Sequence, residues 1–282
     1  MEIAQLVTLV GAGLAAGFIA GLLGVGGGVL FAPVLFFYFE HIGIDPLAIT
    51  PLTLGTSLFC TLVASLVSGY FHFKKGAVVL PVALKTGLLS AVTVILMTRF
   101  VTTKSWYDGD VFQIVFGTLL LVVAGRMIKQ TLDQRNAATP APSEADQPVR
   151  DAPWSKLVGI SALVGVVATA AGVGGGVVMV PAYSNMLKLP IKTAIGTSSA
   201  TIILIAILSS VTYIVAGLGA PVPDSAIGYV DFGHALALVI PAIFTARLGV
   251  GAAHRMDTRR LRWAFAGLAV IISIRLFLRA IG

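Results

Sequence analysis

The feature that most constrains this chain is a series of long segments that carry almost no charge. A helix needs about 20 apolar residues to cross the hydrocarbon core of a bilayer. Of the 282 residues, 57% are hydrophobic and 11% are charged, whereas an average soluble domain has roughly 25% charged residues. One globular core could not bury so much apolar surface, so we expect an all-α integral membrane protein. The runs are Ile3–Leu23, Val29–Phe39, Leu47–Phe71, Ala77–Thr98, Val111–Gly125, Leu157–Ala171, Val177–Leu187, Ala194–Leu218, Ala226–Ala246 and Trp263–Ile274.

A polar stretch divides these runs into two sets. Residues 133–156 are rich in Pro, Ala and charge and show no periodicity, which is typical of a flexible linker. We therefore expect a first transmembrane repeat over residues 1–132 and a second over residues 157–282. The N-terminal Met1-Glu2 lacks the basic segment that opens a signal peptide, so the first run is expected to be part of the mature protein.

The two sets share landmarks in the same order, which indicates an internal duplication. A Gly-Val-Gly-Gly-Gly sequence occurs in both, followed five residues later by proline, then by Gly-Thr-Ser, then by a proline expected to break a helix. A Phe and an Arg ten residues apart close each set. The pairs are 24–28 with 172–176, Pro33 with Pro181, 55–57 with 196–198, Pro81 with Pro241, Phe116 with Phe265, and Arg126 with Arg275. Shared composition of glycine-rich membrane helices would explain single glycines but not this ordered set.

The basic residues predict that the two repeats are inverted relative to each other. Cytoplasmic loops of membrane proteins carry an excess of Lys and Arg. The loop at 40–45 has none, whereas its partner carries Lys188 and Lys192; the loop with Lys74 and Lys75 has an acidic partner at 221–231. A bias that flips at each corresponding loop is typical of inverted repeats.

This charge pattern also predicts the membrane topology. The linker and the Lys188/Lys192 loop should both be cytoplasmic, so residues 157–187 must enter and leave on the same side. Each repeat is then a broken helical hairpin followed by three transmembrane helices. Both termini are expected on the outer side of the cell membrane.

The two glycine clusters are the strongest candidates for a binding site, because glycine is costly inside a helix. A helix that restarts after such a break offers free N–H groups and the positive end of its dipole to an anion. The candidate residues are Gly26, Gly27, Gly28, Gly174, Gly175 and Gly176. The alternative is that these glycines only allow close packing, a role that also suits Gly13, Gly17 and Gly21.

Hydroxyls and two cations within apolar runs complete the candidate substrate site. The hydroxyls of Thr56, Ser57, Thr197, Ser198 and Ser199 could donate to an oxyanion, or could bond back to their own helices. Arg247 and Lys85 lie inside apolar runs, where a charge usually faces a cavity or a partner. For Lys85 the alternative is that the side chain extends to the membrane surface.

The remaining polar residues argue against other classes of protein. The twelve acids all fall in expected loops or termini, and the four histidines lie at or near span ends. The sequence therefore predicts no catalytic site, no metal site and no cofactor, and it offers no intramembrane carboxylate for proton coupling. The formal net charge of +7 is attributed to helix orientation rather than to nucleic-acid binding.

The glycine motif from Gly21 to Pro33, its repeat from Ala168 to Pro181, the Gly-Thr-Ser motifs and the two halves joined by a polar linker resemble the sulfite exporter TauE/SafE family. The resemblance covers essentially the whole chain. It implies a transporter of small sulfur-containing anions such as sulfite, sulfonates or sulfoacetate, held near the midplane between the two breaks. A membrane-embedded enzyme or assembly subunit, a channel, and a carrier of another substrate remain alternatives, and a homodimer is left open.

Overall fold

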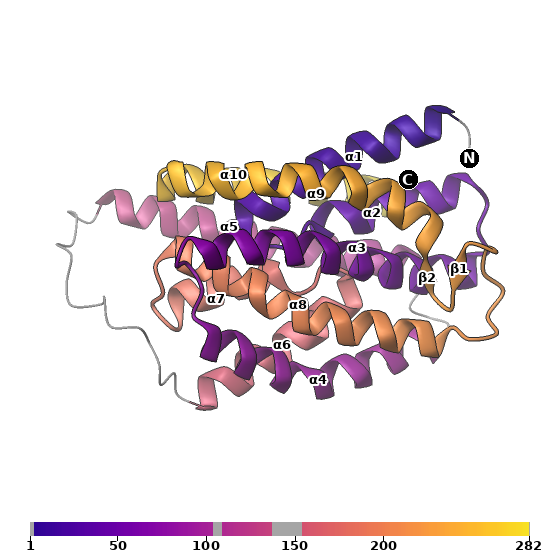
Figure 1. The fold of residues 1–282 in the computed structure, drawn as a ribbon, viewed down its shortest axis with the longest axis horizontal. Helices are drawn as coiled ribbons and strands as arrows, with labels where there is room; N and C mark the ends of the chain where they lie inside the picture. Colours follow the sequence, from indigo (N-terminus) through magenta and orange to yellow (C-terminus); the bar gives the residue numbers. More distant parts are fainter. Residues whose placement is uncertain (1–2, 104–108, 137–153, 282) are drawn as a thin grey trace.

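The computed structural model describes residues 3–103, 109–136 and 154–281, which form ten helices and one small hairpin (Figure 1). Two helices separated by a glycine break open each half, and three longer helices follow. The first half contains α1 (Ile3–Leu23), α2 (Gly28–His41), α3 (Pro46–Lys74), α4 (Leu80–Thr103) and α5 (Gly109–Asn136). The second contains α6 (Trp154–Ala171), α7 (Gly176–Asn185), α8 (Ile191–Ala216), β1 (Ala226–Ile227), β2 (Val230–Asp231), α9 (Phe232–Arg255) and α10 (Thr258–Ile281). The expectation of an all-α fold is confirmed.

Six of the described helices, α1, α3, α4, α6, α8 and α9, are long and apolar enough to cross a membrane. Large apolar side chains on these helices stay exposed, for example Leu88, Val92 and Leu96 on α4. A monomer in water rarely exposes so much contiguous apolar surface. The chain is therefore a multi-pass membrane protein.

Small residues let α1 pack tightly on α9. A Cβ atom at Gly13, Gly17 or Gly21 would collide with the backbone of α9 at positions 238, 242 and 246 respectively. Both sets are spaced by four residues, so one face of each helix carries the whole contact. The packing role expected for these three glycines is confirmed.

The prediction that Pro81 and Pro241 break helices is wrong. Pro81 lies in the first turn of α4, where no internal hydrogen bond to its nitrogen is required. Pro241 lies inside α9, which continues through it to Arg255. Membrane helices tolerate an internal proline because neighbouring groups compensate for the lost hydrogen bond.

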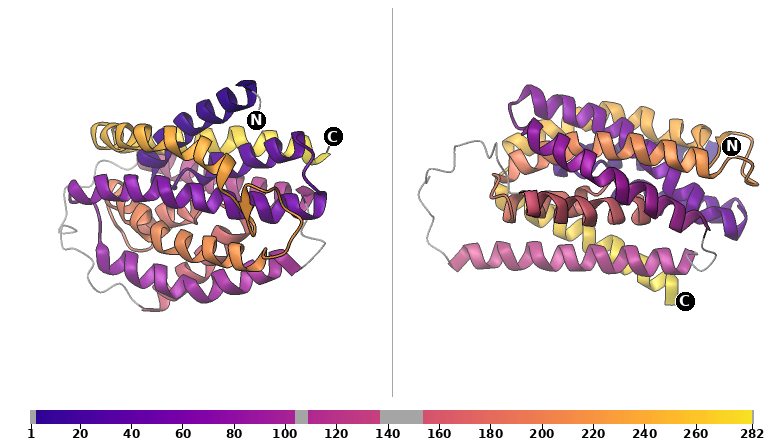
Figure 2. Two further views of the ribbon diagram at one scale, coloured as in Figure 1. Left: turned by 45° about the vertical axis from the view of Figure 1, so that its right-hand side comes forward. Right: turned by 90° about the horizontal axis from the view of Figure 1, so that it is seen from below.

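The helix contacts follow one scheme in both halves (Figure 2). α1 packs on α9. In the matching contact α6, the counterpart of α1, packs on α4, the counterpart of α9. α3 packs on its counterpart α8, and α5 packs on its counterpart α10. Exchanging the halves therefore reproduces these four contacts. In both figures α1 and α6 begin at opposite ends of the molecule, and α3 and α8 run in opposite directions. This arrangement brings the two glycine breaks together.

Candidate substrate site at the glycine breaks

Each break is a short left-handed stretch that glycine allows. The φ angles of Gly24, Gly26 and Gly27 are 66°, 73° and 76°, and those of Gly172, Gly174 and Gly175 are 67°, 65° and 78°. Residues with a Cβ rarely adopt such angles. The repeated glycines therefore end one helix and begin the next within four residues, in the same way in both halves.

The two breaks contact each other in the core of the protein. A Cβ atom at Gly28 would lie 2.5 Å from the Cα of Val173, and one at Gly176 would lie 2.5 Å from the Cα of Val25. Both breaks are buried. The beginnings of α2 and α7 therefore meet where the first half contacts the second.

Serine hydroxyls hold each break from the opposite half. The Oγ of Ser57 donates to the carbonyl oxygen of Gly172 at 2.7 Å. The Oγ of Ser198 donates to the carbonyl oxygen of Gly24 at 2.8 Å. We call these two bonds the reciprocal serine bonds.

Threonine hydroxyls of the same motifs make a second matched pair of bonds. The Oγ1 of Thr56 accepts from the backbone N–H of Asp231, just before α9, at 2.9 Å. The Oγ1 of Thr197 accepts from the N–H of Val79, just before α4, also at 2.9 Å. These four hydroxyls thus bond the backbone of the other half rather than their own helices. Ser199 donates to Ile195 of its own helix at 3.2 Å, as the alternative interpretation held, and its Oγ also lies 3.1 Å from the Oγ of Ser68 in the other half.

Both restarting helices present N–H groups at the breaks. Helical bonding in α2 begins when Leu30 and Phe31 donate to the carbonyl of Gly27, and α7 begins in the same way on Gly175. Within the described part of the chain, no protein acceptor meets the N–H groups of Gly26, Gly27 or Gly28. Such groups, together with the positive end of the helix dipole, favour an anion.

The two predicted cations lie away from the breaks. The Nζ of Lys85 is 5.1 Å from the ring centroid of Trp154, the first residue of α6. Arg247 is exposed and its guanidinium carbon lies 5.4 Å from the ring centroid of Phe71, in a groove between α3 and α9. The structure thus brings the predicted glycines together with the hydroxyls of Ser57 and Ser198. The hydroxyls of Thr56 and Thr197 bond the residues that precede α9 and α4 instead, and the two predicted cations lie apart from the breaks.

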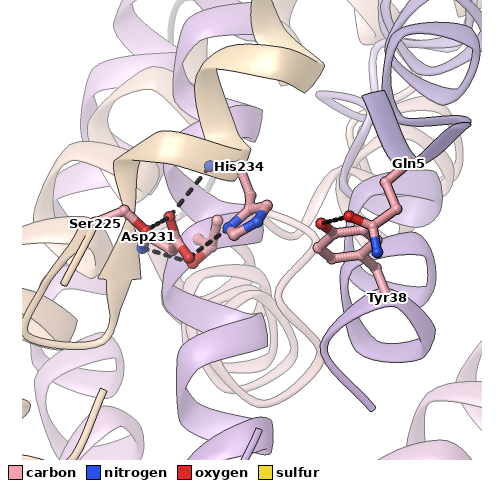
Figure 3. A network of polar contacts seen from close by, with 6 residues as sticks. Gln5, Tyr38, Ser225, Asp231 and His234 are labelled. Atoms are coloured by element: carbon pink, nitrogen blue, oxygen red, sulfur yellow. Dashed lines mark hydrogen bonds and ion pairs between the residues drawn. The ribbon is translucent and has the colours of Figure 1, made fainter. Parts of the chain in front are cut away.

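Asp231 is a buried polar residue that the sequence analysis grouped with loop acids (Figure 3). Its carboxylate accepts from the Nδ1 of His234 at 2.6 Å, from the backbone N–H of His234 at 3.1 Å and from Ser225 Oγ at 2.9 Å. Burial raises the pKa of Asp231, but the bonds from His234 and Ser225 outweigh it, so the pKa lies below its usual value. An aspartate with a histidine three residues later, in the pattern of a helix N-cap, was the available signal.

The ring of His234 leads from this carboxylate toward a cavity. Its centroid lies 4.9 Å from that of Tyr38 on α2, and the Tyr38 hydroxyl donates to Gln5 on α1 at 3.4 Å (Figure 3). Tyr38 and Gln5 line a cavity of about 580 Å³ between α1, α2 and α10, which Arg275 also lines. These contacts connect the start of α9 with the end of α2 and the start of α1.

His72 was also missed as a structural residue. Its Nε2 donates to the carbonyl of Gly21, three residues before the first break, at 3.0 Å. The Tyr213 hydroxyl donates to the corresponding carbonyl, that of Thr169, at 3.1 Å. The end of α1 is thus supported by a histidine and the end of α6 by a tyrosine. The repeated motifs, which are the same in both halves, could not have indicated this difference.

The fold and the paired breaks define a helical membrane protein whose two sets of helices meet at a shared central contact. The family described as sulfite exporter TauE/SafE matches residues 9–276, so the chain belongs to this family and is a membrane transporter. The family is one of transporters rather than enzymes, in agreement with the sequence analysis.

Curated relatives match nearly the whole length of the chain. A probable membrane transporter protein of Haemophilus influenzae is 27% identical over 95% of this chain and 96% of its own length. One from Methanocaldococcus jannaschii is 27% identical over 94% of this chain and 93% of its own. YunE of Bacillus subtilis, also a probable membrane transporter protein, is 26% identical over 98% of both chains. No solved structure matches.

Proposed function

We propose that this transporter moves small sulfur-containing anions such as sulfite, sulfonates or sulfoacetate out of the cell. The observation that carries the proposal is the meeting of two helix beginnings, α2 and α7, at two buried glycine breaks. N–H groups and dipoles of this kind attract an anion without a fixed positive charge, so the anion can also leave again. The sulfite exporter description of the family supports the sulfur chemistry.

We further propose that the halves are inverted repeats in the cell membrane, with both termini outside and the 133–156 linker inside. The opposite directions of α3 and α8, and the start of α1 and end of α10 at one end of the molecule, support this (Figures 1 and 2). An anion held at the breaks would then lie near the midplane. Rocking of one half against the other around that point would expose it to each side in turn.

Lys85 and Arg247 enter the proposal as cations that attract the anion rather than as its ligands. Lys85 packs against Trp154 at the end of the protein where α6 begins, and Arg247 faces outward beside Phe71. A fixed positive charge raises the local concentration of an anion over several ångströms without contact.

Uptake into proteoliposomes tests the proposal. The purified full-length protein is reconstituted, and uptake of labelled sulfite, thiosulfate, sulfoacetate and taurine is compared with that of empty liposomes. We expect saturable uptake of at least one sulfur anion and counterflow, which a channel would not show. Transport of none of the four would overturn the sulfur-anion proposal and favour a different substrate on the same fold.

A further inference from the structure

Two hydroxyls at the breaks, those of Thr61 and Ser65 on α3, have no partner in the described residues. Both side chains are 0% exposed, and neither Thr61 Oγ1 nor Ser65 Oγ makes a hydrogen bond. A buried hydroxyl without a partner is destabilising. Other buried hydroxyls in the described residues share this property, but Thr61 and Ser65 are the ones that lie against the glycine breaks.

The positions of these oxygens are set by the breaks themselves. A Cβ at Gly28 would lie 2.7 Å from Thr61 Oγ1, and one at Gly26 would lie 2.8 Å from Ser65 Oγ. The N–H groups of the same two glycines have no protein acceptor in the described part of the chain. Hydroxyls and backbone N–H groups that have no partner in the described residues therefore lie close together around Gly26 and Gly28.

The second half presents hydrocarbon at the matching positions. With Gly55 aligned to Gly196, Ile202 corresponds to Thr61 and Ala206 to Ser65. Carbon atoms of the Ile202 side chain would lie 3.2 Å, 2.8 Å and 2.9 Å from a Cβ at Gly26, Gly174 and Gly176 respectively. Thr61 and Ile202 thus occupy equivalent places between the breaks with opposite chemistry.

We propose that the anion site is one-sided, with Thr61 and Ser65 donating to the oxygens of the anion and Ile202 facing its non-oxygen side. This inference rests on the proposed function and adds residues and a selection rule to it. An anion with oxygens on every side would leave one oxygen unpaired against Ile202, which is costly. An anion whose binding group has three oxygens, with a carbon atom or a lone pair in the fourth position, satisfies both sides.

The selection rule is tested by competition between two monovalent tetrahedral anions. Methanesulfonate has three oxygens and a methyl group, and perchlorate has four oxygens. In wild-type proteoliposomes, methanesulfonate should inhibit the uptake of labelled sulfite and sulfoacetate at least about tenfold more strongly than perchlorate does. A difference of this size is expected from one unpaired polar atom. The Ile202→Thr variant should lose most of this difference.

The hydroxyls are tested with variants that keep the side-chain shape. Thr61→Val should raise the KM for labelled sulfite and sulfoacetate at least about tenfold, the effect of one hydrogen bond to a charged group. Ser65→Ala should act in the same direction, and Thr61→Ser should retain transport. Thr53→Val is the matched control, because Thr53 is also a fully buried α3 residue, eight residues away, whose hydroxyl has no partner in the described part of the chain. It should leave KM unchanged.

Stability separates a binding role from a structural one. Without ligand, Thr61→Val should melt at the same temperature as wild type or above it, since it removes an unpartnered buried hydroxyl. Equal KM values for Thr61→Val and Thr53→Val, with active wild type, would overturn this inference and leave the proposed function standing. Equal inhibition by methanesulfonate and perchlorate would do the same. Inactivity of the wild type toward every sulfur anion would overturn both.

Discussion

At the scale of single residues, the reciprocal serine bonds tie the two halves together. Ser57 and Ser198 are fully buried, and each donates to the carbonyl of the first residue of the opposite break. Because the two bonds are equivalent, Ser57→Ala and Ser198→Ala should each lower the free energy of unfolding by about 1–2 kcal/mol. Thermal unfolding in detergent measures this, with Ser209→Ala as the control, since the described residues offer the buried Ser209 hydroxyl no partner. A loss in one variant alone would contradict the equivalence.

Asp231 carries a second residue-scale prediction, on pH dependence. Its carboxylate is 0% exposed and paired with His234. The carboxylate accepts three hydrogen bonds, and Asn has one acceptor oxygen instead of two, so Asp231→Asn should lower the free energy of unfolding by about 2 kcal/mol at neutral pH. The folded pKa is lowered, so this contribution is present above the ordinary carboxyl pKa of about 3.9 and disappears as the pH falls through the lower folded value.

Melting curves of wild type and variant between neutral pH and pH 3 measure this difference. The gap between them should be constant near neutrality and shrink in acid. Asp224→Asn is the control, because Asp224 is an exposed acid in the same loop. A gap that widens as the pH falls would contradict the assignment.

At the scale of elements, each glycine break works because its residues are both left-handed and tightly packed. A Cβ at Gly27 would lie 2.8 Å from the Phe31 ring, and one at Gly175 would lie 2.7 Å from Val164. Gly27→Leu and Gly175→Leu should therefore abolish transport, since the side chain fills the proposed site. The amount of protein in the membrane fraction should not fall, because the apolar spans remain.

Gly43→Leu separates backbone strain from the site itself. Gly43 has a φ of 77°, close to that of Gly27, yet nothing lies within 4 Å of a Cβ placed there. This variant should carry the same strain and retain transport. Normal transport by Gly27→Leu or Gly175→Leu would return these glycines to a packing role.

At the scale of the whole molecule, the inverted-repeat proposal fixes the side on which each segment lies. Cys60 is the sole cysteine of the chain and is buried, so labelling in a Cys60→Ala background is clean. Gly282→Cys should react with a membrane-impermeant maleimide on intact cells, and Ala138→Cys should react after permeabilisation alone. Both positions lie outside the described residues. Labelling of Ala138→Cys on intact cells would contradict the topology.

The energetics of export also belong to the whole molecule. The negative interior of a cell drives an anion outward by about 2.3 kcal/mol per charge per 100 mV, which equals a gradient of roughly 40-fold. We therefore expect uncoupled, electrogenic transport. The buried Asp231–His234 pair is the alternative, as a carrier of a coupled proton.

Liposomes separate the two possibilities when the potential is clamped with potassium and valinomycin and the pH gradient is varied independently. Flux should follow the potential. Flux that follows the pH gradient and ignores the potential would favour the proton-coupled alternative, and loss of that dependence in Asp231→Asn would assign it to this pair.

The sequence by itself determined the membrane environment, the helical class, the two halves and the location of both breaks. These properties depend on composition and on glycine, whose effect on the backbone is local. The packing of Gly13, Gly17 and Gly21 was predictable for the same reason, since a spacing of four places them on one helix face.

The tertiary structure alone decided which groups meet. The Gly-Thr-Ser hydroxyls bond the opposite half. Ser57 and Gly172, like Ser198 and Gly24, are separated by more than a hundred residues along the chain. Asp231 looked like a loop acid because its burial depends on elements remote in sequence. Lys85 and Arg247 looked internal because an apolar run does not reveal which face of a helix is covered. Thr61 and Ile202 became comparable once the two breaks were seen to touch, since only long-range packing places both between them.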